Sequence, residues 1–597
     1  MLKAAKQIFY LFDKKEKYFI TFMFVLMLIG TFFEALGMGA IVPFVTLLSR
    51  PDFVKTNAFF GELYNRTGAK NINEFLIILS ASLMGLYVVK NAYLFAVVYI
   101  QSYFCNKKNL KLSSELFQLY LYSPYTFHLQ RNTVELMRNL NLIMPIMSGV
   151  LYRMLDLITD VVVIIVIIVC LICVHPVSSV AIISIMAVSM GLFHLFIRKR
   201  MKIYGQMYSE YLNKTSKQMH QGLGSIKETK IFKREQFFDL QYSSHQKQLV
   251  KTLHWQKVIT EIPRYYIETV TMIMVMGVMI YFLRRGDNPQ VVLFTLSFFC
   301  VAAVRMMPSI YRMGSCMTSI RFYLPSLDTV YNELLIVRSE EERVTRCGNE
   351  GAITFADKIT VEDMTYSYGN NSKFLLNKIS LEINKNNTVG FAGSSGAGKT
   401  TLVDLLIGLM MPNSGRILVD GKDIQTNVSS WQRQIGYIPQ TIYLMDGSIR
   451  DNIAFGLFDE DIDDEKVRRA IKLSQLEDFI NSLPDGMNTM VGERGIRLSG
   501  GQKQRIGIAR ALYYDPGVLV MDEATAALDN ETERAFMEAV KTLSGAKTIL
   551  IIAHRLTTIE HCDVIFFINN GTLVAKGKYH ELLEKSPDFR KMAGREV

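Results

Sequence analysis

Six long apolar segments, separated by polar stretches, fill the first half of the chain. They cover residues 18–48, 74–104, 150–174, 177–198, 265–283 and 289–311. Each has about 20 residues or more, which is enough for a helix to cross roughly 30 Å of hydrocarbon. The pattern therefore predicts six transmembrane helices. The short break Cys173–Ser178 predicts a tight hairpin between the third and the fourth.

The polar connections between the second and third segments and between the fourth and fifth are themselves helical in pattern. Proline or glycine interrupts this pattern near Ser123–Asn132 and near Gln221–Phe232. We therefore expect spans two to five to continue well beyond the bilayer as helices that turn back at these two places.

Positive charge lies mainly in these connections. Residues 198–257 hold 13 Lys and Arg, residues 105–140 hold five, and the loop around Pro176 has none. Positively charged loops stay in the cytosol, so both long connections, the N-terminus and everything after the sixth span are predicted to be cytosolic. Most of the net charge of +11 is then explained by topology, and nucleic-acid binding is not indicated.

The seven cysteines add no site. None has zinc-ribbon spacing, and the pair Cys170 and Cys173 lies inside an apolar run, where packing is the simpler interpretation. We interpret them as scattered thiols in a reducing compartment. The basic, amphipathic N-terminus is not expected to be a cleavable signal peptide.

The pattern changes after residue 336. The charged stretch 337–350 is predicted to be a linker between a membrane domain, 1–336, and a second domain, 351–597. In that second domain, short β-rich runs alternate with helical ones, which indicates an α/β fold.

The segment Gly393–Thr401 (GSSGAGKTT) fits the P-loop pattern and lies between an apolar strand and a helix, as a P-loop requires. Its backbone N–H groups would wrap a phosphate chain, Lys399 would reach the β- and γ-phosphates, and Thr400 would bind Mg²⁺. The predicted ATP-binding residues of this loop are Gly393, Ser394, Ser395, Gly396, Ala397, Gly398, Lys399, Thr400 and Thr401.

A buried strand in Pro516–Thr525 ends in two acids. Asp522 suits the Mg²⁺ shell, and Glu523 suits the polarisation of an attacking water. The plain alternative is an acidic turn between a strand and a helix. Two adjacent carboxylates after an apolar run favour the catalytic interpretation.

Leu498–Arg505 (LSGGQKQR) is a second candidate anion site, because its glycines expose N–H groups at a helix start. One nucleotide needs only one P-loop. The second loop is explained if two such domains face each other head to tail, each P-loop closing over the other's Ser499, Gly500, Gly501 and Gln502.

On these motifs, residues 351–597 resemble the nucleotide-binding domain of ABC transporters. The resemblance implies that Tyr368 stacks on adenine, that Gln440 touches Mg²⁺, and that His554 lies beside the γ-phosphate. It also matches Thr489–Gly495 to the exporter-specific loop and Asp529 to the D-loop. Two positions depart from the family pattern, Ala526 and Asn386, and neither removes a catalytic group. An active ATPase that uses ATP and Mg²⁺ is implied.

The implied fold is a six-helix α-helical transmembrane domain with long cytosolic extensions, followed by an α/β P-loop NTPase domain of the ABC type. Structural-maintenance ATPases share these motifs but separate them by long coiled coils, whereas Lys399 and Leu498 are 99 positions apart here. A channel or regulatory use of the fold is disfavoured by Glu523 and His554. Six spans with one ATPase domain make half a transporter. A homodimer completes it most simply, and a heterodimer stays open.

Ionisable residues inside the spans are costly and mark candidate substrate sites. The set considered is Glu34, Lys90, Arg264, Glu268, Arg305 and Arg312, in which cations outnumber acids four to two. A basic wall of Lys90, Arg264, Arg305 and Arg312 would receive an anionic group such as a diphosphate. The structural alternative is that Arg264 pairs with Glu268 and that Arg312 extends to the membrane boundary.

The membrane half also resembles the PglK-type lipid-linked oligosaccharide flippases, in FFEALGMGAIVPFVTL, PRYYIE, VRMMPSIYR and the amphipathic stretch Asn57–Asn65. That stretch would either hold a polyprenyl tail in the membrane interface or pack on the bundle. The resemblance implies a multi-pass protein of the cytoplasmic membrane that moves a polyprenyl-diphosphate-linked glycan to the outer leaflet. An exporter of peptide, lipid or drug is the alternative, and the sequence does not identify the glycan.

Overall fold

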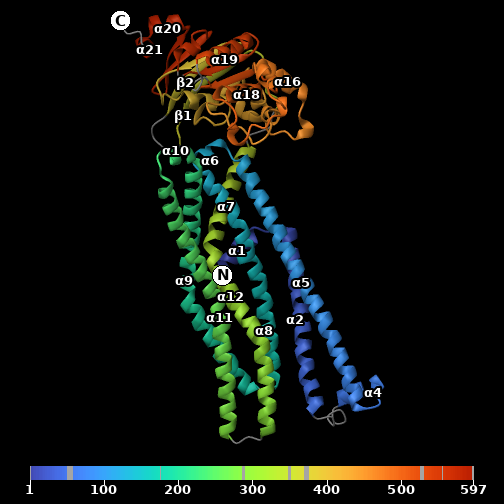
Figure 1. Ribbon diagram of the computed structural model, residues 1–597. Coiled ribbons are helices and arrows are strands. Elements are labelled where there is room, and N and C mark those ends of the chain that lie inside the picture. The colour runs from blue at the N-terminus through green and yellow to red at the C-terminus, as the bar shows by residue number, and fades with distance from the viewer. Residues whose placement is uncertain are drawn as a thin grey trace. The chain divides into compact units, whose positions relative to one another are not determined.

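The computed structural model describes residues 2–49, 58–174, 176–285, 289–346, 351–368, 375–524, 530–553 and 555–593. The chain divides into two compact units. The first is Met1–Ser123 with Gln130–Glu341, and the second is Pro124–Leu129 with Glu342–Val597. The first is helical and the second contains both β-sheets (Figure 1).

The first unit consists of long helices that start and stop where the sequence loses its helical periodicity. They are α1 (Leu2–Tyr10), α2 (Lys14–Ser49), α4 (Ala58–Thr67), α5 (Ile72–Tyr122), α7 (Thr133–Ile146), the π-helical turn η1 (Met147–Leu151), α8 (Tyr152–Val174), α9 (Pro176–Gly224), α10 (Ile226–Ile231), α11 (Glu235–Arg285) and α12 (Pro289–Arg346).

Both expected turning points are breaks between helices. Ser123 has extended backbone angles before Pro124, because a residue that precedes proline avoids the helical region. The second break lies at Ser225, after Gly224. The stretch 337–350, predicted to be a linker, is helical in its first part, because α12 continues to Arg346. The stretch Val337–Arg346 consists largely of good helix formers and lacks glycine and proline.

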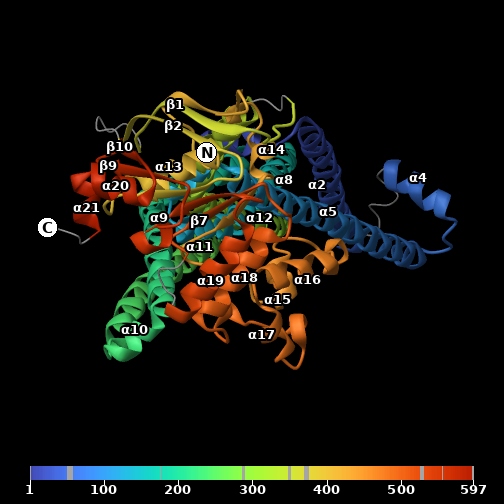
Figure 2. The same cartoon turned by 90° about the horizontal axis from the view of Figure 1, so that it is seen from above.

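Among the described residues, two segments are long and apolar enough to cross a membrane by length and composition alone, Lys14–Glu34 and Ile72–Tyr122. A helix covers each of the six predicted apolar segments, and the number of spans stays a prediction. Figure 2 shows α4 beside the beginning of α5, where Tyr64 meets Phe75 edge to face with ring centroids 5.4 Å apart.

Close contacts at glycines join the helices of this unit. A Cβ at Gly205 of α9 would lie 2.1 Å from the backbone oxygen of Phe322 in α12. A Cβ at Gly149 of η1 would lie 2.2 Å from the ring of Tyr323. The carbonyl oxygen of Gly149 accepts a hydrogen bond from the hydroxyl of Ser319. Helix α12 therefore packs against α9 and η1 at a backbone distance that larger residues would prevent.

The second unit has two sheets. The antiparallel sheet has the order β2-β1-β4-β5, and the larger sheet has the order β10-β9-β3-β8-β7-β6. In the larger sheet, β10 is antiparallel to β9 and the other neighbours are parallel. The strands are β1 (Lys358–Tyr366), β2 (Leu376–Asn384), β3 (Thr388–Ala392), β4 (Ser414–Val419), β5 (Lys422–Asp423), β6 (Ile435–Ile438), β7 (Val518–Asp522), β8 (Thr548–Ile552), β9 (Val564–Asn569) and β10 (Thr572–Gly577).

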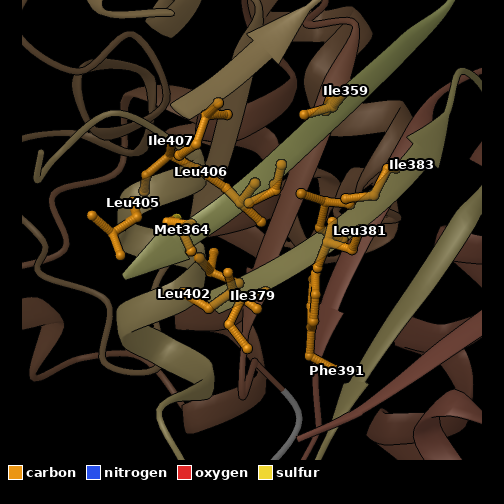
Figure 3. Close-up of a cluster of buried hydrophobic side chains, with 14 of the residues drawn as sticks. Ile359, Met364, Ile379, Leu381, Ile383, Phe391, Leu402, Leu405, Leu406 and Ile407 are labelled. Atoms are coloured by element: carbon orange, nitrogen blue, oxygen red, sulfur yellow. The ribbon is translucent and has the colours of Figure 1, made fainter. Parts of the chain in front are cut away.

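Strands β3, β7 and β8 are buried at every residue, as expected for parallel strands covered on both faces. Side chains of both sheets and of α13 form one core, which includes Met364, Leu381, Phe391 and Leu402 (Figure 3). The helices of this unit are α6 (Tyr125–Leu129), α13 (Lys399–Leu406), α14 (Val428–Gln432), α15 (Ile449–Ile453), α16 (Asp464–Leu473), α17 (Glu477–Asn481), α18 (Gly500–Leu512), α19 (Asn530–Leu543), α20 (Tyr579–Lys585) and α21 (Pro587–Met592).

Candidate functional site

The predicted P-loop joins β3 to α13. Gly396 and Gly398 have φ angles of 79° and 98°, a region that favours glycine. A Cβ at Gly393 would lie 2.2 Å from the carbonyl oxygen of Ile568, so only glycine fits there. Helix α13 begins without a side-chain cap, and its first N–H groups stay available to an anion. The loop thus has the backbone geometry of a phosphate cradle.

Lys399 lies under this loop. It is buried, and its Nζ donates to the carbonyl oxygens of Gly393 at 2.8 Å and Ser394 at 3.1 Å. Burial lowers the pKa of Lys399, and the charges of Glu523 and Asp522 oppose this shift. The lysine is therefore close to both acids that the sequence singled out.

Asp522 is the last residue of β7, which lies between β8 and β6 in the larger sheet, and Glu523 directly follows it. Asp522 is buried and accepts a long hydrogen bond of 3.5 Å from the hydroxyl of Tyr437. Glu523 has a φ of 49°, and its Oε2 accepts a hydrogen bond of 2.6 Å from Nε2 of Gln440. The loop glutamine and the predicted catalytic carboxylate are thus in direct contact.

Oxygen donors of the kind that Mg²⁺ prefers are present at this site. They are the exposed hydroxyl of Thr400, the amide oxygen of Gln440 and the carboxylate of Asp522. Among the described residues, no group of three or more His, Cys, Asp and Glu side chains could hold a metal. The hydroxyl, amide and carboxylate oxygens would fit Mg²⁺ that is bound together with nucleotide phosphates.

Tyr368 lies at the rim of the P-loop. Its ring is 42% exposed, and its hydroxyl is 3.1 Å from Oγ1 of Thr401. An exposed aromatic ring held at one edge offers a face for stacking, as the predicted adenine contact requires.

Three residues of this site were missed by the sequence analysis. Burial and the charge of Asp522 raise the pKa of Asp404 to about 6. The hydroxyl of Tyr437 meets Asp522, and burial with the charges of Asp404 and Asp522 raises the pKa of Tyr125 in α6. Tyr125 could not be found from its own surroundings, because its neighbours here are distant in sequence. Asp404 had a signal, since it is an acid on the apolar helix that follows the P-loop.

The second predicted anion loop begins α18. Ser499 and Gln502 form a reciprocal capping box, in which Oγ of Ser499 accepts from the backbone N–H of Gln502 and the glutamine Oε1 accepts from that of Ser499. Among the described residues of one chain, no hydrogen bond joins Ser499 or Gln502 to Lys399 or Tyr368. Gly500 is exposed and Gly501 half-buried, so this helix start lies at the surface of its unit.

Two predicted residues of the ATP site, Asp529 and His554, lie outside the described residues.

The predicted substrate residues have different environments. Lys90 is 5% exposed, with its Nζ 5.3 Å from the ring centroid of Tyr87. Arg264 is exposed, with its guanidinium over the ring of Tyr265. No ion pair joins Arg264 to Glu268 within the described part of the chain, so the suggested neutralisation of this pair is wrong. The side chain of Arg305 lies outside the part of the chain that the structure describes.

Arg312 requires a correction to the count of charges. Its Nε and Nη2 donate to Asp160 of α8 at 3.0 and 2.7 Å, and Nη2 also reaches Oγ of Ser309 at 3.3 Å. The third predicted span also contains Asp156, which bonds Arg153 and Gln101. The excess of four cations over two acids left out these three charged residues. With them, the set of residues considered holds five cations and four acids.

Within the stretch Asn57–Asn65, the described residues belong to α4, which begins at Ala58. Its described apolar side chains Phe60, Leu63 and Tyr64 pack on the cluster around Leu47 and Phe75. This face of α4 therefore packs on neighbouring helices, as the second of the two alternatives for this stretch predicts. The side chain of Phe59 lies outside the described residues.

Comparison with known proteins agrees with this geometry. Residues 18–300 match the family described as ABC transporter transmembrane region, and residues 376–526 match ABC transporter. Over 98% of its length, the chain superimposes on 99% of a bacterial Atm1-family ABC exporter with ATP bound, with a TM-score of 0.79 and 22% identity.

Curated relatives cover different parts of the chain. An ATP-dependent lipid A-core flippase of Ralstonia nicotianae is 28% identical over 85% of both chains. The heterocyst differentiation ATP-binding protein HepA of Nostoc is 38% identical over 49% of this chain and 47% of its own length. The leukotoxin translocation ATP-binding protein LktB of Mannheimia haemolytica is 42% identical over 38% of this chain and 32% of its own. The chain thus spans about half or less of HepA and LktB and most of the flippase.

Since both family regions match in order, and the phosphate loop, the two acids and the glutamine meet in one site, this chain belongs to the ABC transporters and has the organisation of an exporter-type half-transporter.

Proposed function

We propose that this chain, as a homodimer in the cytoplasmic membrane with its ATPase domain in the cytosol, uses ATP and Mg²⁺ to move a polyprenyl-diphosphate-linked oligosaccharide to the outer leaflet. The lipid A-core flippase, which matches 85% of this chain, supports a lipid cargo of this general kind.

Arg312 is the observation that carries the choice of cargo. Asp160 is 3% exposed in its side chain and holds one edge of the guanidinium, while the Arg312 side chain stays 46% exposed. With Nε and Nη2 donating to Asp160 and Ser309, the N–H groups of Nη1 stay available in a fixed orientation. A positively charged donor of this kind suits the oxygens of a phosphate.

The other three residues of the proposed substrate site would add positive charge around Arg312. Arg264 is exposed and adds a second cation, and Arg305 lies seven positions before Arg312 on the same helix. Lys90 is buried against Tyr87, so it contributes charge and no direct contact in this conformation.

In the ATP site, we assign the residues to nucleotide binding, Mg²⁺ binding and hydrolysis. Gly393–Thr401 and Tyr368 would bind the nucleotide, while Thr400, Asp522 and Gln440 would hold Mg²⁺, which offsets phosphate charge when bound. Glu523 would accept hydrogen bonds from the attacking water and orient it, and His554 would contact the γ-phosphate. The contact between Gln440 and Glu523 would keep that carboxylate in place before nucleotide binds.

The double variant R305Q/R312Q tests the cargo. It should move a polyprenyl-diphosphate glycan across proteoliposomes at least about tenfold more slowly than the wild type, because the charge that receives the diphosphate is lost. Basal ATP hydrolysis should persist, since its residues all lie in the second unit.

The matched control is R153Q, which removes an arginine that also pairs with an aspartate of α8. Normal glycolipid movement by R305Q/R312Q would reject the proposed cargo site. An equal loss in R153Q would instead indicate a general need for ion pairs among these helices.

A further inference from the structure

A second group of basic side chains lies away from Arg312, where α9 meets α12. It consists of His194 and Arg198 on α9 and Arg321 on α12, and we refer to it as the basic cluster. Nη2 of Arg321 is 2.6 Å from Nε2 of His194, and the imidazole nitrogen accepts because arginine can only donate.

Not every guanidinium nitrogen of Arg321 has an acceptor among the described residues. Its Nη1 is buried from solvent and has no hydrogen-bond partner among the described residues. A buried donor without an acceptor is unfavourable, and more so when it is charged. No carboxylate forms an ion pair with Arg198 or Arg321 in the described part of the chain. Among the described residues, Nη1 of Arg321 therefore has no acceptor and no negative charge balances the two arginines.

A small cavity of about 10 Å³ is lined in part by the side chain of Arg321. It has room for one water-sized atom, which is also the size of a single phosphate oxygen. Its lining includes Met190, Phe193, Ile197 and Thr318 beside the three basic residues.

The basic cluster lies at the cytosolic edge of the predicted bilayer. His194 and Arg198 end the predicted fourth span and are followed by Lys199 and Arg200. On the same stretch of α9, Leu192 and Phe196 are 62% and 69% exposed, as expected for side chains in lipid. Arg321 bonds His194 and so lies beside the predicted cytosolic end of the fourth span. In the sequence it lies ten residues beyond position 311, the predicted end of the sixth span.

We propose that the basic cluster binds the phosphate of an inner-leaflet phospholipid. One phosphate oxygen would enter the cavity and accept from Nη1 of Arg321. Arg198, which is exposed, would contact the part of the phosphate that stays outside. Acyl chains would extend along the exposed apolar side chains of α9. This site differs from the one at Arg312 and does not depend on the nature of the cargo.

Native mass spectrometry of the full-length protein, titrated with phosphatidylglycerol, tests this proposal. The wild type should bind phosphatidylglycerol at least about tenfold more tightly than R321Q, and diacylglycerol of the same chain length should not bind at this site. The matched control R200Q removes an exposed arginine that lies over the ring of Phe196, and it should bind as the wild type does.

R198Q provides a second variant in case R321Q does not fold, because Arg198 is exposed and its loss leaves the helix contacts intact. It should also weaken phospholipid binding. Inorganic phosphate is titrated in parallel. Binding of inorganic phosphate alone, lost in R321Q, would keep the phosphate site and reject the lipid as its source. Equal phosphatidylglycerol binding by wild type, R321Q and R198Q would overturn the proposal and leave a buried water as the partner of Nη1.

Discussion

Glu523 combines a chemical role with an unfavourable backbone. Its φ of 49° lies in the left-handed region, which costs a non-glycine residue of order 1 kcal/mol. The same turn directs its carboxylate to Gln440. A residue held in this way is a good candidate for the group that orients water, because its position is fixed before substrate arrives.

Replacing Glu523 by glutamine should leave ATP binding intact and slow hydrolysis by about 100-fold or more. The amide keeps the size of the side chain and its contact with Gln440 but cannot accept a proton. Nucleotide binding and phosphate release by the purified protein measure the two effects separately. E465Q, at an exposed position of α16, is the control. Turnover at the wild-type rate would remove Glu523 from its proposed role.

Asp404 gives a prediction about pH. Its pKa in the folded protein is about 6, against an ordinary value of 3.8. The folded state therefore binds this proton more tightly than the unfolded state does, and the contribution to stability falls as the pH rises from about 4 to 6.

The variant D404N removes this unfavourable charge, so it should be more stable than the wild type at pH 7.5, by about 3 kcal/mol. At pH 4.5 the difference should fall to about a third of that, because the carboxyl group is then mostly protonated in the folded state. Thermal unfolding of the full-length protein at both pH values measures it. A Tm that falls equally at both would mean that the ionised carboxylate stabilises the fold.

Residue identities in the ATP site were predictable because each is tied to a short motif. Gly393, Lys399 and Asp522 are recognisable from their neighbours in sequence. Asp160 was visible as an acid in the third apolar segment, but its importance depends on Arg312, which is 152 positions away. Contacts of this kind depend on which helix faces meet, and periodicity along one helix does not specify them.

At the scale of elements, proline and glycine in the sequence predicted where the helices break near Ser123 and Ser225. The sequence did not predict how long each helix is. The apolar segments predict where a helix crosses lipid, and they say little about how far it continues. Helix α12 runs through Val337–Arg346 because good helix formers carry it onward. The bond between Arg321 and His194 brings α12, ten residues beyond the predicted end of the sixth span, beside the predicted end of the fourth span.

Gly205 tests the packing of α9 on α12. Alanine there should destabilise the protein by about 1–3 kcal/mol, because its Cβ would lie 2.1 Å from a backbone oxygen of Phe322. G191A is the matched control on the same helix, since nothing lies within 4 Å of its Cβ position. It should be neutral or slightly stabilising, as alanine favours helix. Thermal unfolding of both variants in detergent measures this difference, and equal Tm values would contradict the close packing.

At the scale of the whole molecule, the fold class followed from a simple contrast between an apolar helical half and an α/β half with nucleotide motifs. The oligomeric state does not follow from the structure of one chain, because each proposed ATP site combines the P-loop of one chain with the Ser499–Gln502 loop of a second chain. Ser499 and Gln502 bond to each other and present an exposed helix start, which suits contact with a second copy.

Mixed dimers test that arrangement. With K399A in one subunit and S499R in the other, one ATP site should stay intact, and about half of the hydrolysis should remain if the two sites act independently. With both substitutions in one subunit and a wild-type partner, neither site should be intact. If each site were built within one chain, the two results would be exchanged. Tandem purification of differently tagged subunits, followed by ATPase assays, distinguishes the two cases.

The grouping of Pro124–Leu129 with the second unit has a consequence for exchanging parts between related transporters. The module that carries the ATPase is not one continuous piece of sequence, since six residues from the other half of the gene belong to it. A chimera that replaces only residues 342–597 would set a native α6 against a foreign surface. Residues 124–129 should travel with the ATPase domain in any such exchange, and chimeras made with and without them should differ in how well ATP use drives transport.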